Sequence, residues 1–174
     1  LDGKLSPGVT AKDLILAVIH EIGVDGGRGY VIEYTGSCVA SLGMEERMTI
    51  CNMSIESGAR AGLMGPDQTT FSYIEGRTFA PTGDAWEHLV EDWRRLPTDP
   101  DASYDKVFVL DASSVAPMVT YGTTPGMSVP VSGSIPDTAG SPAVDQALAY
   151  MRGQRGEALL GKPVDVVFIG SCTN

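Results

Sequence analysis

The sequence has few of the residues on which several common classes of protein depend. Its three cysteines are an odd number without a Cys-x-x-Cys pair, which argues against a disulfide framework and favours a reducing, cytoplasmic compartment. The two histidines, His20 and His88, stand far apart, so no Ser–His–Asp or Cys–His arrangement can be argued from them. The sequence also lacks a Walker loop and a zinc ligand set.

Two further absences concern partners. No apolar run approaches the ~20 residues that a membrane span requires, and no signal peptide is visible. Basic residues are outnumbered 12 to 22, which gives a formal net charge of −10 and no basic stripe. Because phosphate binding needs a basic surface, this charge argues against a nucleic-acid partner. A small anionic substrate would need local positive charge.

Helical and strand patterns alternate along the chain. Periodicity and capping signals predict helices over residues 10–22, 44–62, 84–95 and 142–151, and strands over 30–34, 69–73, 106–110 and 164–169. The alternation predicts an α/β fold of layered αβα type. We expect one α/β domain over residues 1–103. Residues 104–174 would form a linker and the start of the next domain.

A glycine-rich stretch at residues 23–29 raises the question of dinucleotide binding. That fingerprint must follow a strand and open a helix. Here the stretch follows the helix that ends near Ile22 and precedes the strand that begins at Tyr30. The order is therefore wrong for a nucleotide site, and the stretch is interpreted as a turn.

Asn52 and Glu56 are the first candidate site residues. They are four positions apart on the helix predicted over 44–62, so they lie on one face, which Arg60 continues. A carboxylate on so apolar a helix should be paired or lie near a cation or metal. From the residues alone, a functional site and a structural salt bridge are equally good interpretations.

Cys172 is the third candidate. It follows the apolar run at 164–169, which is typical of a strand covered on both faces, and ligands gather at the carboxyl ends of such strands. A buried free cysteine is the alternative. The long Gly-, Pro-, Ser- and Thr-rich segment 117–136 either lines a cleft or is a plain crossover between domains.

Two motifs resemble a known family. The segment from Val166 to Asn174, VVFIGSCTN, resembles the iron–sulfur signature of the aconitase family, and Met48 to Ala59, MTICNMSIESGA, resembles its second signature. The resemblance extends over essentially the whole chain. Within the family, the stretches ARAG at 59–62 and PD at 66–67 are most similar to the isopropylmalate isomerase branch.

The resemblance implies a chemistry and assigns three residues to it. Cys172 matches the first of three cysteines that bind a [4Fe–4S] cluster, whose fourth iron is free for substrate. Asn52 and Glu56 match catalytic residues beside that cluster, with Glu56 near the water or hydroxyl on the open iron. The implied reaction is a reversible dehydration and rehydration of a small hydroxy-dicarboxylic acid. The implied partner is a separate small subunit.

The chain also departs from the family pattern. The family's other two cluster cysteines form a downstream Cys-x-x-Cys pair, which this sequence lacks, and Cys38 and Cys51 do not match those positions. Neither end reads as a natural terminus, so we expect an internal fragment that alone binds no stable cluster and is inactive. The alternatives are a homoaconitase or aconitase-type hydratase, or an RNA-binding relative, which the negative charge disfavours.

Overall fold

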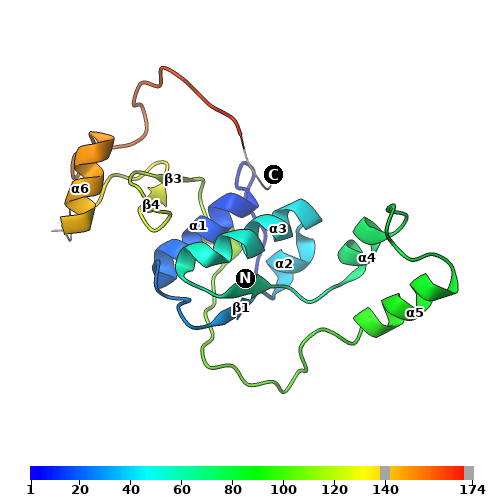
Figure 1. Cartoon of the computed structure of the whole chain (residues 1–174). Helices are drawn as coiled ribbons and strands as arrows, with labels where there is room; N and C mark the ends of the chain where they lie inside the picture. The colour runs from blue at the N-terminus through cyan, green and yellow to red at the C-terminus, as the bar shows by residue number, and fades with distance from the viewer. Residues whose placement is uncertain (138–141, 171–174) are drawn as a thin grey trace.

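The computed structural model describes residues 1–137 and 142–170. Its central body contains the helices α1 (Ala11–Ile22), α2 (Ser37–Ser41) and α3 (Met44–Met53), the strands β1 (Val31–Glu33) and β2 (Ala61–Leu63), and the 3-10 turns η1 (Ser54–Ser57) and η2 (Ala112–Ser114). On one side of this body lie α4 (Gln68–Ile74) and α5 (Asp84–Trp93). On the other lie β3 (Met118–Thr120), β4 (Ser128–Pro130) and α6 (Pro142–Met151) (Figure 1).

Helix α1 forms because its cap and its apolar stripe agree. The Asp13 carboxylate accepts hydrogen bonds from the backbone N–H and the hydroxyl of Thr10, both at 2.7 Å, which satisfies the helix start. The helix ends at Gly23, whose φ of +81° favours glycine. These features confirm the helix predicted over residues 10–22.

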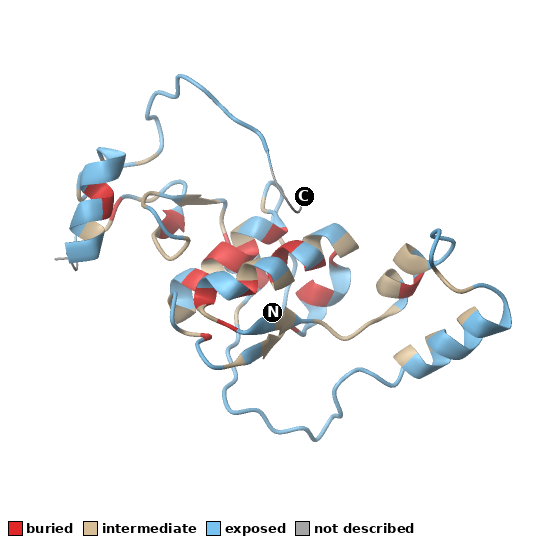
Figure 2. Cartoon of the chain, in the orientation of Figure 1, coloured by how far each residue is buried: buried red, intermediate tan, exposed pale blue. Residues whose placement is uncertain are grey.

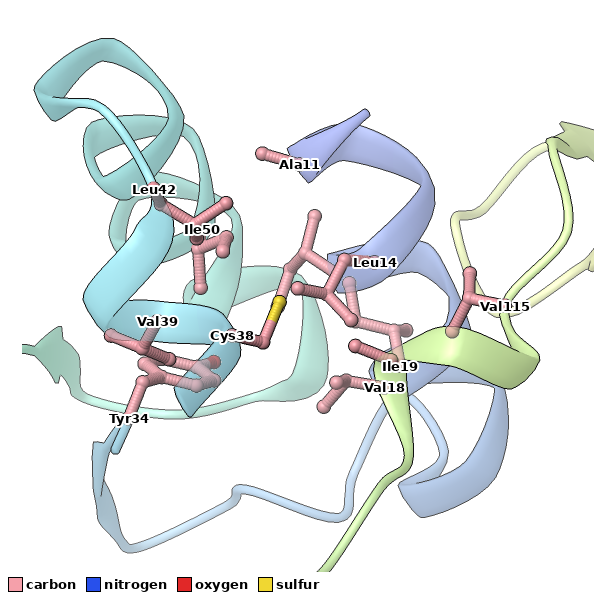
Figure 3. Packing of buried hydrophobic residues seen from close by; sticks show 12 residues of the cluster. Ala11, Leu14, Val18, Ile19, Tyr34, Cys38, Val39, Leu42, Ile50 and Val115 are labelled. Atoms are coloured by element: carbon pink, nitrogen blue, oxygen red, sulfur yellow. The ribbon is translucent and has the colours of Figure 1, made fainter. Parts of the chain in front are cut away.

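The core of the molecule surrounds α1. Its side chains Leu14, Ile15 and Ile19 are fully buried, and they pack with Cys38 of α2 and Ile50 of α3 (Figure 3). Residues 110, 112 and 115 join the same cluster from much later in the chain. Burying each large aliphatic side chain contributes roughly 1.5–3 kcal/mol. Figure 2 shows that the buried residues concentrate here, whereas α5 and the segment after α6 are largely exposed.

The strands form two separate pairs. β1 and β2 run parallel, with Val31 opposite Ala61. β3 and β4 form an antiparallel hairpin, with Met118 opposite Pro130. The structure therefore mixes helices and strands, as the sequence predicted. Within the described ranges, no helix is long and apolar enough to span a membrane.

The helix predicted over 44–62 ends at Met53, so its prediction was wrong at the C-terminal end. The chain passes through η1, turns at Gly58 with a φ of +81°, and enters β2. A Cβ at Gly62 would lie 2.1 Å from the Ser54 hydroxyl, so this close approach of β2 requires glycine. Arg60 does not continue a helical stripe, because its backbone N–H donates to the Tyr30 carbonyl of the neighbouring turn.

The strand predicted over 69–73 is instead helix α4, so that prediction was wrong. Asp67 caps this helix by accepting hydrogen bonds from the backbone N–H groups of Thr69 and Thr70, at 3.0 and 3.2 Å. The two threonines favoured a strand by their β-branching. The aspartate cap outweighs that local preference.

The segments 106–110 and 164–169 are not strands in the structure, contrary to the prediction. Val107 is 75% exposed and Ile169 is 93% exposed, so the second segment is not covered on both faces. The physical reason is the lack of pairing: no strand within residues 1–137 and 142–170 forms a ladder with either segment. A lone extended segment gains no ladder hydrogen bonds.

An ion pair between a buried arginine and a partly exposed aspartate joins α3 to the start of α4. The Arg47 side chain is 5% exposed, and its two terminal nitrogens lie 2.7 and 2.8 Å from the two carboxylate oxygens of Asp67. Its Nε donates to the Leu42 carbonyl at 3.0 Å. The hydrogen bond from Arg47 lowers the pKa of Asp67 below its ordinary value. One carboxylate therefore both neutralises the buried guanidinium and caps α4.

We predict that Asp67→Asn lowers the free energy of unfolding by about 2 kcal/mol at neutral pH, because it leaves Arg47 buried without a counter-charge. The expected loss is modest because the Asp67 side chain is 41% exposed and solvent screens its charge. Because folding lowers the pKa of Asp67, its contribution is present above the unfolded pKa of about 4 and is lost as the pH falls further, through the folded value.

Urea unfolding of wild type and variant across this pH range measures the effect, and the difference should shrink in acid. Glu91→Gln is the control, because Glu91 pairs with Arg95 on the surface. That change should cost less than about 0.5 kcal/mol. Equal stability of Asp67→Asn and wild type at neutral pH would contradict the prediction.

Candidate functional site

An open pocket of about 620 Å³ lies between the start of α1, the η1 turn and the β3–β4 hairpin. Both hairpin strands pack against α1 (Figure 1). The pocket walls are rich in hydroxyl groups and carry charges of both signs. They include Lys12 and Asp13 of α1, Glu56 of η1, and the threonines at 10, 120, 123 and 124.

Glu56 reaches the pocket because its neighbours anchor the turn that carries it. Ser54 and Ser57 are buried on either side, and each has its hydroxyl satisfied internally. Ser54 donates to the Ile50 carbonyl at 2.9 Å and lies 2.8 Å from the Tyr34 hydroxyl. Ser57 donates to the Ser54 carbonyl at 2.7 Å. The serines therefore fix η1 from the inside, and the exposed Glu56 lines the pocket.

The glycine-rich turn at 23–29 contacts η1, the turn that carries Glu56. The Gly27 N–H donates to the Ser57 carbonyl at 2.8 Å. A Cβ on Gly58 would lie 3.1 Å from the Val24 carbonyl oxygen, so the two turns fit together closely. The interpretation of this stretch as a turn is confirmed. Its role in the structure is to hold η1.

Asp13 links two walls of the pocket. One carboxylate oxygen caps α1 through Thr10. The other accepts a hydrogen bond of 2.7 Å from the backbone N–H of Met118, at the start of β3 and 105 positions away in sequence. Both oxygens are engaged in holding the walls of the pocket, so Asp13 differs from Glu56.

Lys12 supplies positive charge at the same place. It lies in the first turn of α1, where the helix dipole disfavours a cation by roughly 0.3–1 kcal/mol. Within the described part of the chain, no hydrogen bond or ion pair engages the side chain of Lys12 or of Glu56. The pocket therefore presents an ammonium group and a carboxylate that are both free to meet a ligand.

The structure brings together some of the predicted site residues. Glu56 lines the pocket, but Asn52 is exposed on α3 and is not part of its wall. Cys172 lies outside the described residues. Of the two interpretations of the segment 117–136, the structure favours the lining of a cleft, because residues 122–125 form part of the pocket wall.

Sequence reasoning missed Lys12 and Asp13 as site residues. The spacing of Thr10 and Asp13 indicated a cap, and nothing in it indicated the contact with Met118. Only one signal could have pointed to Lys12: a small anionic substrate needs local positive charge on so acidic a chain. A second pocket of about 360 Å³, lined by β1 and residues 103–108, contains none of the predicted site residues.

The described residues do not fit an iron–sulfur cluster on their own. Within residues 1–137 and 142–170, no group of three or more His, Cys, Asp or Glu side chains could hold a metal ion. Cys38 is fully buried in the core. Burial raises the pKa of both the Cys38 and the Cys51 thiols, which disfavours the thiolate form that binds iron.

Comparison with known proteins gives a consistent result. The model of the aconitase family (aconitate hydratase) matches residues 1–174. The chain is 59% identical to the 3-isopropylmalate dehydratase large subunit of Roseiflexus castenholzii, over 100% of this chain and 38% of that protein. It is 52% identical to the 3-isopropylmalate dehydratase large subunit of Solibacter usitatus, over 100% of this chain and 39% of that protein.

The chain thus spans a little over a third of the length of these curated relatives. The family match covers every residue, including both motifs that carry the resemblance. The chain therefore belongs to the aconitase family.

Proposed function

We propose that this chain is part of the large subunit of a 3-isopropylmalate dehydratase, a hydro-lyase that interconverts 2- and 3-isopropylmalate in leucine biosynthesis. The identities of 59% and 52% to large subunits of that name over the whole chain support this substrate. The structural observation that carries the proposal is the free carboxylate of Glu56 in a hydroxyl-rich pocket that also contains Lys12.

The pocket residues suit such a substrate chemically. Isopropylmalate carries two carboxylates, and a chain with a net charge of −10 needs local positive charge to bind it. Lys12 supplies that charge for one carboxylate, and the wall threonines donate hydrogen bonds. In the dehydration direction Glu56 donates a proton to the hydroxyl that leaves as water, and in the hydration direction its carboxylate takes a proton back from the attacking water. A positioned acid or base of this kind contributes typically 10²–10⁴-fold to a rate.

The cofactor and the partner follow from the family and from the names of the relatives. We propose that the complete protein carries a [4Fe–4S] cluster, to which Cys172 contributes one ligand and beside which Asn52 lies. When bound, the cluster supplies Lewis acidity toward a hydroxyl and a carboxylate.

The term "large subunit" in the relatives' names supports a small-subunit partner. We place the enzyme in the cytoplasm, and we expect the 174-residue chain alone to be inactive.

We also propose that the complete protein has a layered αβα architecture, divided near residue 103. The parallel pairing of β1 and β2 supports a layered sheet, since parallel strands are normally covered on both faces. Residues 94–109 are exposed throughout, as expected of a connection between domains. The apolar residues at 107–109 and 166–169 are likewise exposed and could extend such a sheet.

The test uses the full-length protein, reconstituted anaerobically with iron and sulfide and mixed with its small subunit. Absorbance of the unsaturated intermediate formed from 3-isopropylmalate measures turnover. We predict that Glu56→Gln lowers kcat by about 10²–10⁴-fold and leaves the cluster absorbance unchanged. Glu21→Gln, an exposed change at the far end of α1, is the control and should retain activity. Full activity of Glu56→Gln would contradict the acid–base role assigned to Glu56.

The same assay with citrate and homocitrate separates the proposed substrate from the alternatives within the family. Turnover of isopropylmalate alone is the expected result. Turnover of citrate or homocitrate, with isopropylmalate ignored, would keep the hydro-lyase chemistry but contradict the assigned substrate.

Lys12 provides a second prediction. Lys12→Met should raise the KM for isopropylmalate about tenfold or more, because a hydrogen bond to a charged group contributes about 1.5–3 kcal/mol. Lys12→Arg should retain most of the affinity. Lys162→Met is the matched control, since Lys162 already pairs with Glu157 at 2.8 Å outside the pocket. A KM that is unchanged in Lys12→Met would show that the substrate carboxylate binds elsewhere.

A further inference from the structure

We propose that Asp13 is a positioning residue, a carboxylate strut that holds the β3–β4 hairpin in place as one wall of the pocket that Glu56 also lines. The proposal rests on the proposed function, because it assigns to the hairpin wall a part in binding the substrate. Asp13 acts through the hairpin and does not itself touch the substrate.

The hairpin needs such a strut. Each of its strands is three residues long, and an isolated two-stranded hairpin is marginally stable in water. Its other backbone hydrogen bonds close the hairpin on itself, for example Tyr121 N–H to the Met127 carbonyl at 2.9 Å and Val131 N–H to the Pro117 carbonyl at 2.8 Å.

A single hydrogen bond fixes the hairpin to α1 within the described part of the chain. It is the bond of 2.7 Å from the Met118 N–H to Asp13. The other hairpin contacts with α1 are packing contacts, which restrict sliding less than a directional bond does. The segment that follows β3 provides the pocket residues 122–125, so a shift of Met118 would move that wall relative to Glu56.

A plain helix cap would not explain this geometry. Glu46 has the plain role in α3, where its carboxylate accepts a hydrogen bond of 2.8 Å from the Gly43 N–H. Glu46 stands three residues after the position it caps, as Asp13 does after Thr10. Only Asp13 extends its second oxygen to a strand. The two carboxylates therefore form a matched pair that separates capping from positioning.

Three variants of the full-length protein, assembled with its small subunit, test the proposal. Asp13→Ala removes both acceptor oxygens, so the cap and the strut are lost together. Met118→Pro removes the donor of the strut and leaves the cap of α1 intact, and proline is tolerated at the first residue of a strand. Because the Met118 side chain itself lines the pocket, hydrogen exchange is the decisive readout for this variant. Glu46→Ala removes only the cap of α3.

Hydrogen exchange of the amides at 118–130 is the first readout. It should speed up at least about tenfold in Asp13→Ala and in Met118→Pro, and stay at the wild-type rate in Glu46→Ala. The second readout is the split between KM and kcat for 3-isopropylmalate. Both strut variants should raise KM at least about fivefold with a smaller change in kcat, as expected for lost binding at the wall. Glu46→Ala should leave both constants near wild type.

Two results would overturn the proposal. The first is wild-type exchange at 118–130 in both strut variants. The second is a KM in those variants that changes no more than in Glu46→Ala. If wild type itself turns over none of the hydroxy acids, the proposed function fails, and the exchange experiment still decides whether Asp13 holds the hairpin.

Discussion

Burial of helix α1 is the constraint on which the rest of the structure depends. Its apolar side chains form the centre of a cluster that gathers α2, α3 and residues 110–115. Several fully buried aliphatic side chains together contribute more than any single polar contact in the chain. The ion pair of Arg47 and Asp67 fixes the position of α4 relative to this body. Hydrophobic burial thus places the elements, and the polar contacts orient them.

The candidate site is a consequence of that packing. The face of α1 turned to the core leaves its first turn free to border a pocket, with Lys12 and Asp13 at its edge. In η1, the buried serines beside Glu56 satisfy their own hydroxyls and fix the turn that carries this exposed residue to the pocket. The hairpin closes the third side through one hydrogen bond to Asp13. Charge and hydroxyl groups therefore meet where three separate stretches of sequence converge.

Local signals in the sequence were sufficient for some of this arrangement. The cap and stripe of the helix over 10–22 lie within one stretch, and the resemblance to a family singled out Glu56. The contact between Asp13 and Met118 spans 105 positions, and no periodicity encodes it. The apolar runs at 106–110 and 164–169 predicted strands, because composition indicates burial but says nothing about which strand pairs. Contacts distant in sequence were therefore the part that a single sequence could not provide.

The central claim is that the pocket between Lys12 and Glu56 binds the substrate. A crystal structure of the full-length protein and its small subunit, soaked with 3-isopropylmalate, tests this claim most directly. The account predicts the ligand in this pocket, with a carboxylate on Lys12 and the Glu56 carboxylate within hydrogen-bonding distance of the ligand. Binding in the other pocket, lined by β1 and residues 103–108, would contradict the account.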